Sequence, residues 1–329
     1  MEKKRRVKIT GTGFYAPEQI LTNADLEKMI DTTDEWIMSR SGIRERHIAG
    51  ADQATSDLCL EAAKRALADA ELEPSDMDLI LVATNSPDTI FPATACYVQA
   101  GLGANHAPAF DLIAGCTGWL YGLIVAESMI LSGNARRVLV IGGEVLTKIT
   151  NWKDRGTCVL FGDAAGAAVL EESHDESGIL SHYWKADGTL SGLLHIPAGG
   201  TRRPASLQTV AENLHTIQMK GNEVFKHAVK RMGEAAEEAL RRAHLTKEQV
   251  DIFIPHQANI RIIDAVGERL DMDREKVYVN IDRYGNVSVA CIPIALHELR
   301  QAKKLHPGTN VLLAAFGAGF TWAAIAYRW

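Results

Sequence analysis

A repeat at a fixed spacing of 173 residues constrains the fold of this chain more than any other feature. Residues 60–84 (LEAAKRALADAELEPSDMDLILVAT) share identical residues with residues 233–257 (GEAAEEALRRAHLTKEQVDIFIPHQ) at matched positions. A second pair, 136–144 (RRVLVIGGE) and 309–317 (TNVLLAAFG), is alike at the same spacing. Two separated matches at one offset are not expected by chance, so one supersecondary unit is used twice.

Each copy of the repeat is typical of a helix followed by a buried strand. Ala and Leu recur at positions i, i+3, i+4 and i+7, which indicates a helix. The apolar runs 79–84 and 252–255 predict strands covered on both faces. We therefore expect an α/β fold with two mixed sheets layered with helices, in which residues 1–172 form one half and 173–329 the other. A cleft at their junction is the expected ligand site.

Length and charge exclude several classes of protein. A chain of 329 residues can bury a large core, and its net charge of −6 gives no positive field for nucleic acid. The apolar stretch 117–131 is shorter than the ~20 residues of a membrane span and contains Glu127, so it predicts a core helix. The charged start, 1–6, precedes a glycine-rich run that predicts a strand and not a signal peptide.

The cysteines indicate a reducing environment. They are odd in number, scattered and without a CxxC pair, which argues against a disulfide framework and a zinc site. We therefore expect a cytoplasmic protein without a metal centre. The five are Cys59, Cys96, Cys116, Cys158 and Cys291.

Cys116 has the context of a nucleophile. It lies in DLIAGCTGWLYGL, between an expected strand (APAFDLI) and the apolar helix, and the glycines beside it allow a sharp turn. A thiol at a helix N-terminus meets the positive end of the helix dipole and free backbone N–H groups. Both effects lower the thiol pKa and favour the thiolate. The alternative is a small buried apolar residue, which free cysteine often is.

Two residues of the second half lie at comparable places. His256 follows the strand VDIFIP, at the carboxyl end where α/β folds keep their sites, although a structural histidine fits that position too. Asn286, in RYGNVSVACIPIALHE, follows a glycine turn that opens a helix, and a plain turn is its alternative.

The small residues of 316–320 (FGAGF) follow the strand VLLAA. They allow a backbone N–H to approach a ligand oxygen closely, as an oxyanion hole requires. A tight connection between strands is the alternative. The patterns GxGxxG, GxxxxGK[ST], GxSxG and HExxH are absent from the sequence.

At these residues the chain resembles the β-ketoacyl-acyl carrier protein synthase III family, the initiating condensing enzymes of fatty-acid synthesis in the thiolase superfamily. The resemblance covers essentially the whole chain and is carried by motifs in the family's order. They are DEWIMSRSGIRERHI, GCTGW, DRGTCVLFGDAAGAAVL, MKGNEVFKHAV, PHQANIRII, YGNVSVACIPIAL and FGAGFTW. The resemblance implies a duplicated thiolase-like fold and a decarboxylative Claisen condensation between an acyl-CoA starter and malonyl-ACP.

The family's catalytic roles transfer to residues of this chain. Cys116 is implied to take the acyl group, and His256 and Asn286 to hold the malonyl thioester oxygen as carbon dioxide leaves. Elongating relatives use Cys-His-His and thiolases a second cysteine, so the Cys-His-Asn set favours the initiating synthase. The N–H groups of Cys116 and Ala318 are implied to bind the acyl oxyanion, and the family often has glycine where Ala318 stands.

Substrate contacts follow from the same resemblance, with no cofactor required. The carrier protein is implied to meet Arg261, and Phe91, Leu146 and Phe161 to shape the acyl pocket, with Phe91 lent across a homodimer. A related acyltransferase or specialised ketosynthase, and a CoA-binding or redox-sensing protein, remain the alternatives. The implied CoA contacts are Thr32, Trp36, Arg40, Arg155, Gly221, Asn222, Ala258 and Asn259.

Overall fold

The computed structural model describes residues 5–329, so residues 1–4 of the charged start lie outside the described part. The strands are β1 (Arg6–Tyr15), β2 (Ile20–Thr22), β3 (Glu45–His47), β4 (Leu79–Ala83), β5 (Ala109–Leu112), β6 (Arg137–Val145), β7 (Asp163–Ser173), β8 (Gly178–Ala186), β9 (Leu194–His195), β10 (Gln218–Met219), β11 (Ile252–Pro255), β12 (Asn310–Gly317) and β13 (Thr321–Arg328).

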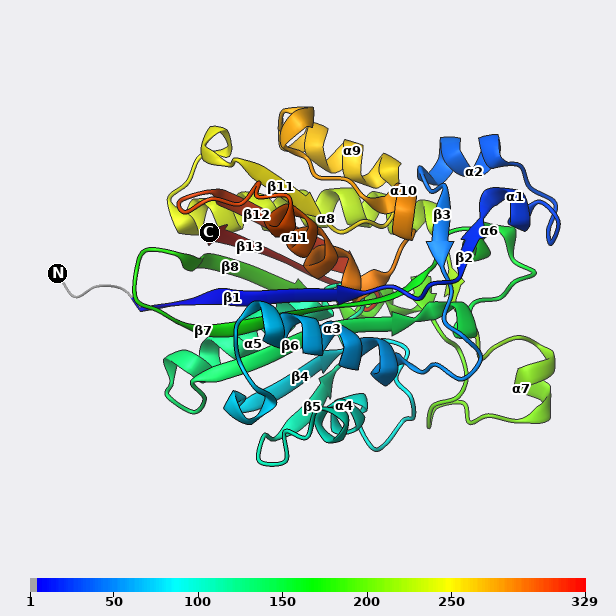
Figure 1. The fold of residues 1–329 in the computed structure, drawn as a ribbon. Helices are drawn as coiled ribbons and strands as arrows, with labels where there is room; N and C mark the ends of the chain where they lie inside the picture. Colours follow the sequence, from blue (N-terminus) through cyan, green and yellow to red (C-terminus); the bar gives the residue numbers. More distant parts are fainter. Residues whose placement is uncertain (1–4) are drawn as a thin grey trace.

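The α-helices alternate with these strands (Figure 1). They are α1 (Asn23–Leu26), α2 (Asp34–Ser41), α3 (Thr55–Asp69), α4 (Thr94–Leu102), α5 (Gly118–Leu131), α6 (Arg155–Cys158), α7 (Leu207–Ala211), α8 (Gly221–Ala243), α9 (Ile260–Arg269), α10 (Ile281–Tyr284) and α11 (Cys291–Gln301). Short 3₁₀ turns include η3 (Gly188–Leu193) and η6 (Ser288–Ala290).

Two mixed sheets form the framework, as expected. One has the order β1-β7-β6-β4-β5, and the other has the order β11-β12-β13-β8. In the first, β4 is parallel to both β5 and β6, whereas β7 is antiparallel to β6 and β1. In the second, β11 is parallel to β12, and the remaining pairs are antiparallel.

The repeated segments occupy equivalent places in the two sheets. The helix-strand pairs predicted from the repeat are α3 with β4 and α8 with β11. The strands β6 and β12, which also follow the 173-residue spacing, each lie beside β4 or β11 in a parallel pair. The parallel core of each sheet is thus built from the repeated unit.

Helices lie between the sheets and on their outer faces. The central core joins α5 and α11 to the inner faces of both sheets. On the outer side α3 and α4 cover the first sheet, and α8 and α9 cover the second. Strand β4 is covered by side chains on both faces. Leu79 and Leu81 pack into the central core, whereas Ile80 and Val82 pack against α3. A strand that buries both faces gives the continuous apolar run seen in the sequence.

The stretch 117–131 forms the buried helix α5, as predicted, and packs in the central core. The run after the charged start forms β1, also as predicted. Among residues 5–329, none of the helices combines the length and apolar character needed to cross a membrane.

Candidate active site

A cavity of about 960 Å³ lies where the two halves of the chain meet. Its wall includes all three residues singled out from the sequence, Cys116, His256 and Asn286, together with Ala318. His256 and Ala318 directly follow the strands β11 and β12, and Cys116 and Asn286 shortly precede α5 and η6. The ends of these elements, from both halves of the chain, therefore meet at the cavity. The volume is within the range of small-molecule sites.

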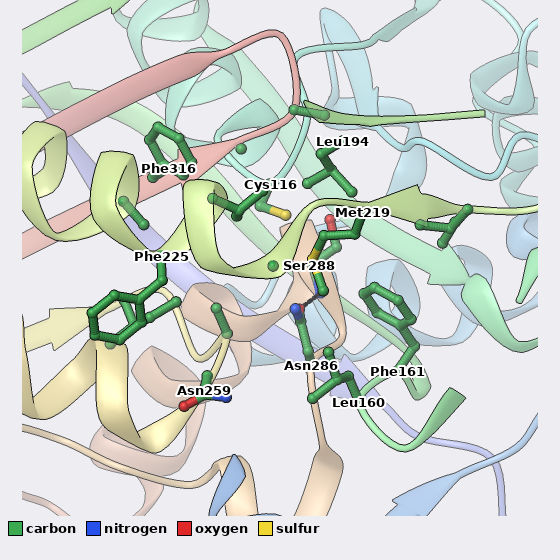
Figure 2. Close-up of a pocket in the computed structure, with 18 of the residues that line it drawn as sticks. Cys116, Leu160, Phe161, Leu194, Met219, Phe225, Asn259, Asn286, Ser288 and Phe316 are labelled. Atoms are coloured by element: carbon green, nitrogen blue, oxygen red, sulfur yellow. Dashed lines mark hydrogen bonds between the residues drawn. The ribbon is translucent and has the colours of Figure 1, made fainter. Parts of the chain in front are cut away.

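Cys116 lies at the N-terminal end of α5, as predicted. It precedes Thr117, the residue that flanks the first helical turn, and Thr117 donates to the Ala114 carbonyl at 2.5 Å. Figure 2 shows the Cys116 sulfur pointing into the cavity, on the side where Ser288 and Asn286 lie. A thiol held there can reach a bound thioester.

The expected lowering of the Cys116 pKa is wrong. Burial raises the pKa of Cys116 to about 12, and a hydrogen bond from Ser288 lowers it only in part, while the negative charge of Glu144 raises it further. Removal from water disfavours the thiolate more than the helix end favours it. Ionisation of this thiol therefore depends on groups that contact the sulfur.

His256 is buried and uncharged. It follows β11, its backbone N–H donates to the Ala314 carbonyl at 2.8 Å, and its side chain is almost inaccessible. Burial lowers the pKa of His256 to about 4, so the ring is neutral at physiological pH. Its Nδ1 atom has no hydrogen-bond partner among residues 5–329. A neutral imidazole offers one N–H donor, and the His256 residue lines the cavity.

Asn286 has its side-chain orientation fixed by the backbone around it. Its backbone N–H donates to the Leu160 carbonyl at 2.8 Å, and its Oδ1 accepts from the Ser288 N–H at 2.9 Å (Figure 2). Because an N–H must meet an oxygen, the amide nitrogen is the atom left to face the cavity. Asn286 is therefore a held donor at any pH.

The backbones around Cys116 and Ala318 interlock. A Cβ added at Gly115 would collide with Ala318, and one added at Gly317 would collide with the nitrogen of Cys116. Gly115 also has a φ of +57°, which favours glycine. Ala318 has no positive φ, so alanine fits there and keeps its N–H donor. FGAGF is also the turn between β12 and β13, which confirms the alternative of a tight strand connection, and the oxyanion role stays a prediction.

The mouth of the cavity carries an aromatic and cationic cluster. The Arg155 guanidinium lies 4.4 Å from the centre of the Trp36 ring, and that of Arg40 lies 5.9 Å from it. Arg155 also donates to the Asp31 carbonyl at 3.0 Å. Trp36 and Arg40 line the cavity, whereas Arg155 and Thr32 do not. The buried Thr32 hydroxyl has no hydrogen-bond partner among the described residues.

The remaining residues that were expected to contact substrate mostly border the same cavity. Asn259 caps α9 by accepting from the Arg261 N–H at 2.9 Å and donates to the Arg40 carbonyl at 2.8 Å, which joins the halves at the mouth. The Arg261 guanidinium lies over the Phe225 ring at 5.7 Å. The lining residues in this group are Gly221, Asn222, Ala258, Asn259 and Arg261.

The acyl-pocket residues separate into two groups. Leu146 and Phe161 form a buried apolar cluster with Ile217 that lines the cavity. Phe91 does not line it, and its side chain is 82% exposed on the outside of this chain. Phe91 thus does not form part of the cavity wall of its own chain.

Three residues beside Cys116, the expected nucleophile, were missed from the sequence. The buried Glu144 and Ser288 and the half-buried Asn85 form a hydrogen-bonded group next to Cys116. The signal was one carboxylate directly after the uncharged run VLVIGG of β6, because a charged residue is rarely buried without a reason. No cluster of three or more metal-ligating side chains occurs among residues 5–329.

Comparisons with known proteins agree with this geometry. Two family models described as 3-oxoacyl-[acyl-carrier-protein] synthase III match residues 110–188 and, for the C-terminal part, residues 240–329. A β-ketoacyl-[acyl-carrier-protein] synthase III of Caldanaerobacter subterraneus subsp. tengcongensis is 57% identical over 321 residues, 98% of this chain and 97% of its own. One from Desulfitobacterium hafniense is 53% identical over 323 residues, 98% of each chain.

The chain belongs to the 3-oxoacyl-[acyl-carrier-protein] synthase III family. The crystal structure of the Aquifex aeolicus synthase III is 48% identical, with a TM-score of 0.92 over 98% of this chain and 100% of that one. This similarity confirms the expected thiolase-like α/β fold. As a β-ketoacyl-ACP synthase III, the protein is a condensing enzyme of the acyltransferase type that acts in fatty-acid synthesis.

Proposed function

We propose that this synthase III joins an acyl-CoA starter to malonyl-ACP through an acyl group carried on Cys116. The observation that supports this most directly is the convergence of the Cys116 thiol, the neutral His256 ring and the oriented Asn286 amide on one cavity. A nucleophile beside two uncharged donors matches a reaction that proceeds through an acyl-enzyme and then an enolate.

In the first step the Cys116 sulfur attacks the thioester carbonyl of acyl-CoA. The S–H proton is lost, a C–S bond forms to Cys116, and the CoA thiolate leaves and takes up a proton. The carbonyl oxygen becomes an oxyanion in between. The adjacent N–H groups of Cys116 and Ala318 are our proposed donors to that oxygen.

In the second step malonyl-ACP loses carbon dioxide, and the carbon–carbon bond electrons pass into an enolate. His256 and Asn286 donate to the thioester oxygen on which the negative charge develops. The enolate carbon then attacks the acyl carbonyl, and the Cys116 thiolate leaves. A histidine that stays neutral suits this role, because it donates a hydrogen bond without giving up its proton.

We propose that CoA binds along the mouth of the cavity. Trp36 with the nearby Arg155 offers a face for the adenine, with Thr32 and Arg40 beside it. Gly221, Asn222, Ala258 and Asn259 line the path toward Cys116 as the pantetheine channel. The exposed Arg261 at the start of α9 is the proposed contact for an acidic carrier protein.

We further propose a homodimer. An exposed group of large apolar side chains stands on and around α4 and β5, on the first half of the chain. An apolar surface of this kind is typical of a protein interface. The group consists of Ile90, Phe91, Tyr97, Phe110 and Ile113. In such a dimer Phe91 is the residue that we expect to reach the acyl pocket of the partner subunit, beside Leu146 and Phe161.

The division at residues 172 and 173 is proposed to separate two copies of one thiolase-like half. The sheet positions of the 173-residue repeat support this division. The two proposed steps use a thiol and N–H donors, so we propose that the enzyme needs no cofactor beyond its substrates. A cytoplasmic location is proposed from the scattered, unpaired cysteines.

The test is a condensation assay with acyl-CoA and malonyl-ACP in which product and carbon dioxide are both measured. Cys116→Ala is expected to abolish product while CoA affinity, measured by calorimetry, stays close to that of the parent. Cys59→Ala is the matched control, because Cys59 is fully buried and does not line the cavity. Undiminished condensation by Cys116→Ala would contradict the proposal.

A further inference from the structure

A buried carboxylate lies behind the nucleophile. Glu144, in β6, is fully buried and accepts hydrogen bonds from four donors. A carboxylate has about four acceptor positions, so these bonds nearly saturate it. The donors are the Asn85 Nδ2 at 2.6 Å, the Ser86 hydroxyl at 2.6 Å, the Asn85 backbone N–H at 3.0 Å and the Thr84 hydroxyl at 3.4 Å.

The Asn85 amide connects this carboxylate to Ser288. Its Nδ2 donates to Glu144 at 2.6 Å and to the Ser288 Oγ at 3.1 Å, which uses both amide hydrogens. Because the carboxylate can only accept, it fixes which end of the amide faces it. The Ser288 oxygen is therefore an acceptor toward Asn85, and its own hydrogen must point to another atom.

Two acceptors stand near the Ser288 hydroxyl. One is the Cys116 sulfur, which lines the same cavity and lies on the side of Ser288 (Figure 2), and the other is Glu144, which the Asn85 amide joins to Ser288. Glu144 is nearly saturated by its other donors, which leaves the sulfur as the acceptor for this hydrogen. The Ser288 backbone is held in place as well: it has a φ of +47°, and its N–H donates to the Asn286 Oδ1. A non-glycine residue keeps such a conformation only where its surroundings enforce it.

We propose that Glu144 and Asn85 are positioning residues that hold the Ser288 hydroxyl as a hydrogen-bond donor to the sulfur of Cys116. The proposal rests on the acyl-enzyme role of Cys116 argued above and adds the means by which a buried sulfur carries negative charge. That charge appears twice, before the sulfur attacks acyl-CoA and when it leaves the acyl group during condensation. A hydrogen bond to a charged atom is stronger than one to a neutral atom, so the donor favours both steps.

The experiment measures the rate at which Cys116 becomes acylated, by quenched-flow and mass spectrometry of the Cys116 peptide. Ser288→Ala is expected to slow acylation about 10- to 100-fold, the range for loss of a hydrogen bond to a charged group. Glu144→Gln is expected to slow acylation by a smaller factor, because it also removes the negative charge that raises the Cys116 pKa. CoA affinity is expected to stay unchanged in both. The double variant is expected to be no slower than Ser288→Ala alone, because Glu144 acts through the hydroxyl that Ser288→Ala removes.

Asp163→Asn is the matched control for Glu144→Gln. Asp163 is also fully buried in the first sheet, accepts from Thr147 and from the Ala49 N–H, and does not line the cavity. We expect Asp163→Asn to lower the melting temperature without slowing acylation of the folded enzyme. If Glu144→Gln does not fold, Ser288→Ala decides the matter alone, because it removes one oxygen atom and keeps the backbone N–H to Asn286.

Acylation at the parental rate in folded Ser288→Ala would overturn the proposal. A parallel fall of CoA affinity and acylation rate would also overturn it, since that pattern marks general damage to the site. Failure of the underlying function is a separate result: the parent itself would then show no acyl group on Cys116.

Discussion

Gly317 and Cys116 are in such close backbone contact that a side chain at 317 would overlap the nitrogen of Cys116. The contact joins the end of β12 in the second half to the start of α5 in the first. It brings the Cys116 and Ala318 backbones to one place. The positions of the proposed oxyanion donors are therefore set by the packing of the two halves and not by either loop alone.

Gly317→Ala is expected to force these two loops apart. Loss of one oxyanion donor costs about 10²- to 10³-fold in kcat in related chemistry, and we expect a fall of that order in acyl transfer. Steady-state kinetics on the folded variant measures it. Gly188→Ala is the control, since a Cβ at Gly188 meets no atom within 4 Å. Unchanged kcat in Gly317→Ala would contradict the expected crowding.

Acid is expected to destabilise the fold partly through His256. Its pKa is lowered by burial to about 4, below the ordinary 6.5, so the unfolded chain takes up the proton first as pH falls. The neutral ring therefore contributes its full amount to the free energy of unfolding above pH 6.5, and this contribution is lost as the pH falls toward 4. The shift corresponds to roughly 3 kcal/mol.

Chemical denaturation of the parent and of His256→Asn between pH 7 and pH 4 measures this effect. The unfolding free energy of the variant should fall less steeply with acid over that interval. His306→Asn, which changes an exposed histidine, should keep the parental slope. Equal slopes in the parent and His256→Asn would show that His256 does not titrate as its burial requires.

Trp36→Ala is expected to weaken binding of acyl-CoA. Stacking of an aromatic side chain on a nucleic-acid base contributes about 1–3 kcal/mol, so KM should rise roughly 5- to 100-fold, with a smaller change in kcat. Trp184→Ala serves for comparison, because Trp184 is also part-exposed but lies away from the cavity on β8. Similar KM values for the parent and Trp36→Ala would remove Trp36 from the proposed adenine site.

The exposed apolar group on the first half is expected to hold a dimer together. Light scattering after size exclusion should give twice the chain mass for the parent and the chain mass for Phe91→Asp/Ile113→Asp. Two buried carboxylates at an apolar interface would oppose association. Leu207→Asp, on α7, places a charge at a 94% exposed leucine and should leave the dimer intact. A monomeric parent would contradict the proposed assembly.

The sequence predicted the fold where local pattern and repeat spacing determine it. The spacing of 173 residues relates the first residues of β4 and β11, Leu79 and Ile252, and those of β6 and β12, Arg137 and Asn310. The strand before Cys116 and the helix after it were also predicted, because both have clear apolar patterns.

The pKa of Cys116 and the contacts around it could not be predicted in the same way. The expected low pKa of Cys116 was wrong because the local sequence contains the helix end but not the burial that the second half imposes. Ser288, Asn85 and Glu144 come from three distant segments, so their contacts exist only after the sheets have packed. Exposure of Phe91 likewise depends on where α4 lies in the folded chain.

The most direct test of the acyl-enzyme proposal is intact-protein mass spectrometry after mixing the enzyme with a panel of acyl-CoAs. We expect a mass increase equal to one acyl group, located on the Cys116 peptide and absent from Cys116→Ala, with the preferred chain length identifying the starter. No adduct with any acyl-CoA, or an equal adduct in Cys116→Ala, would contradict the role of Cys116.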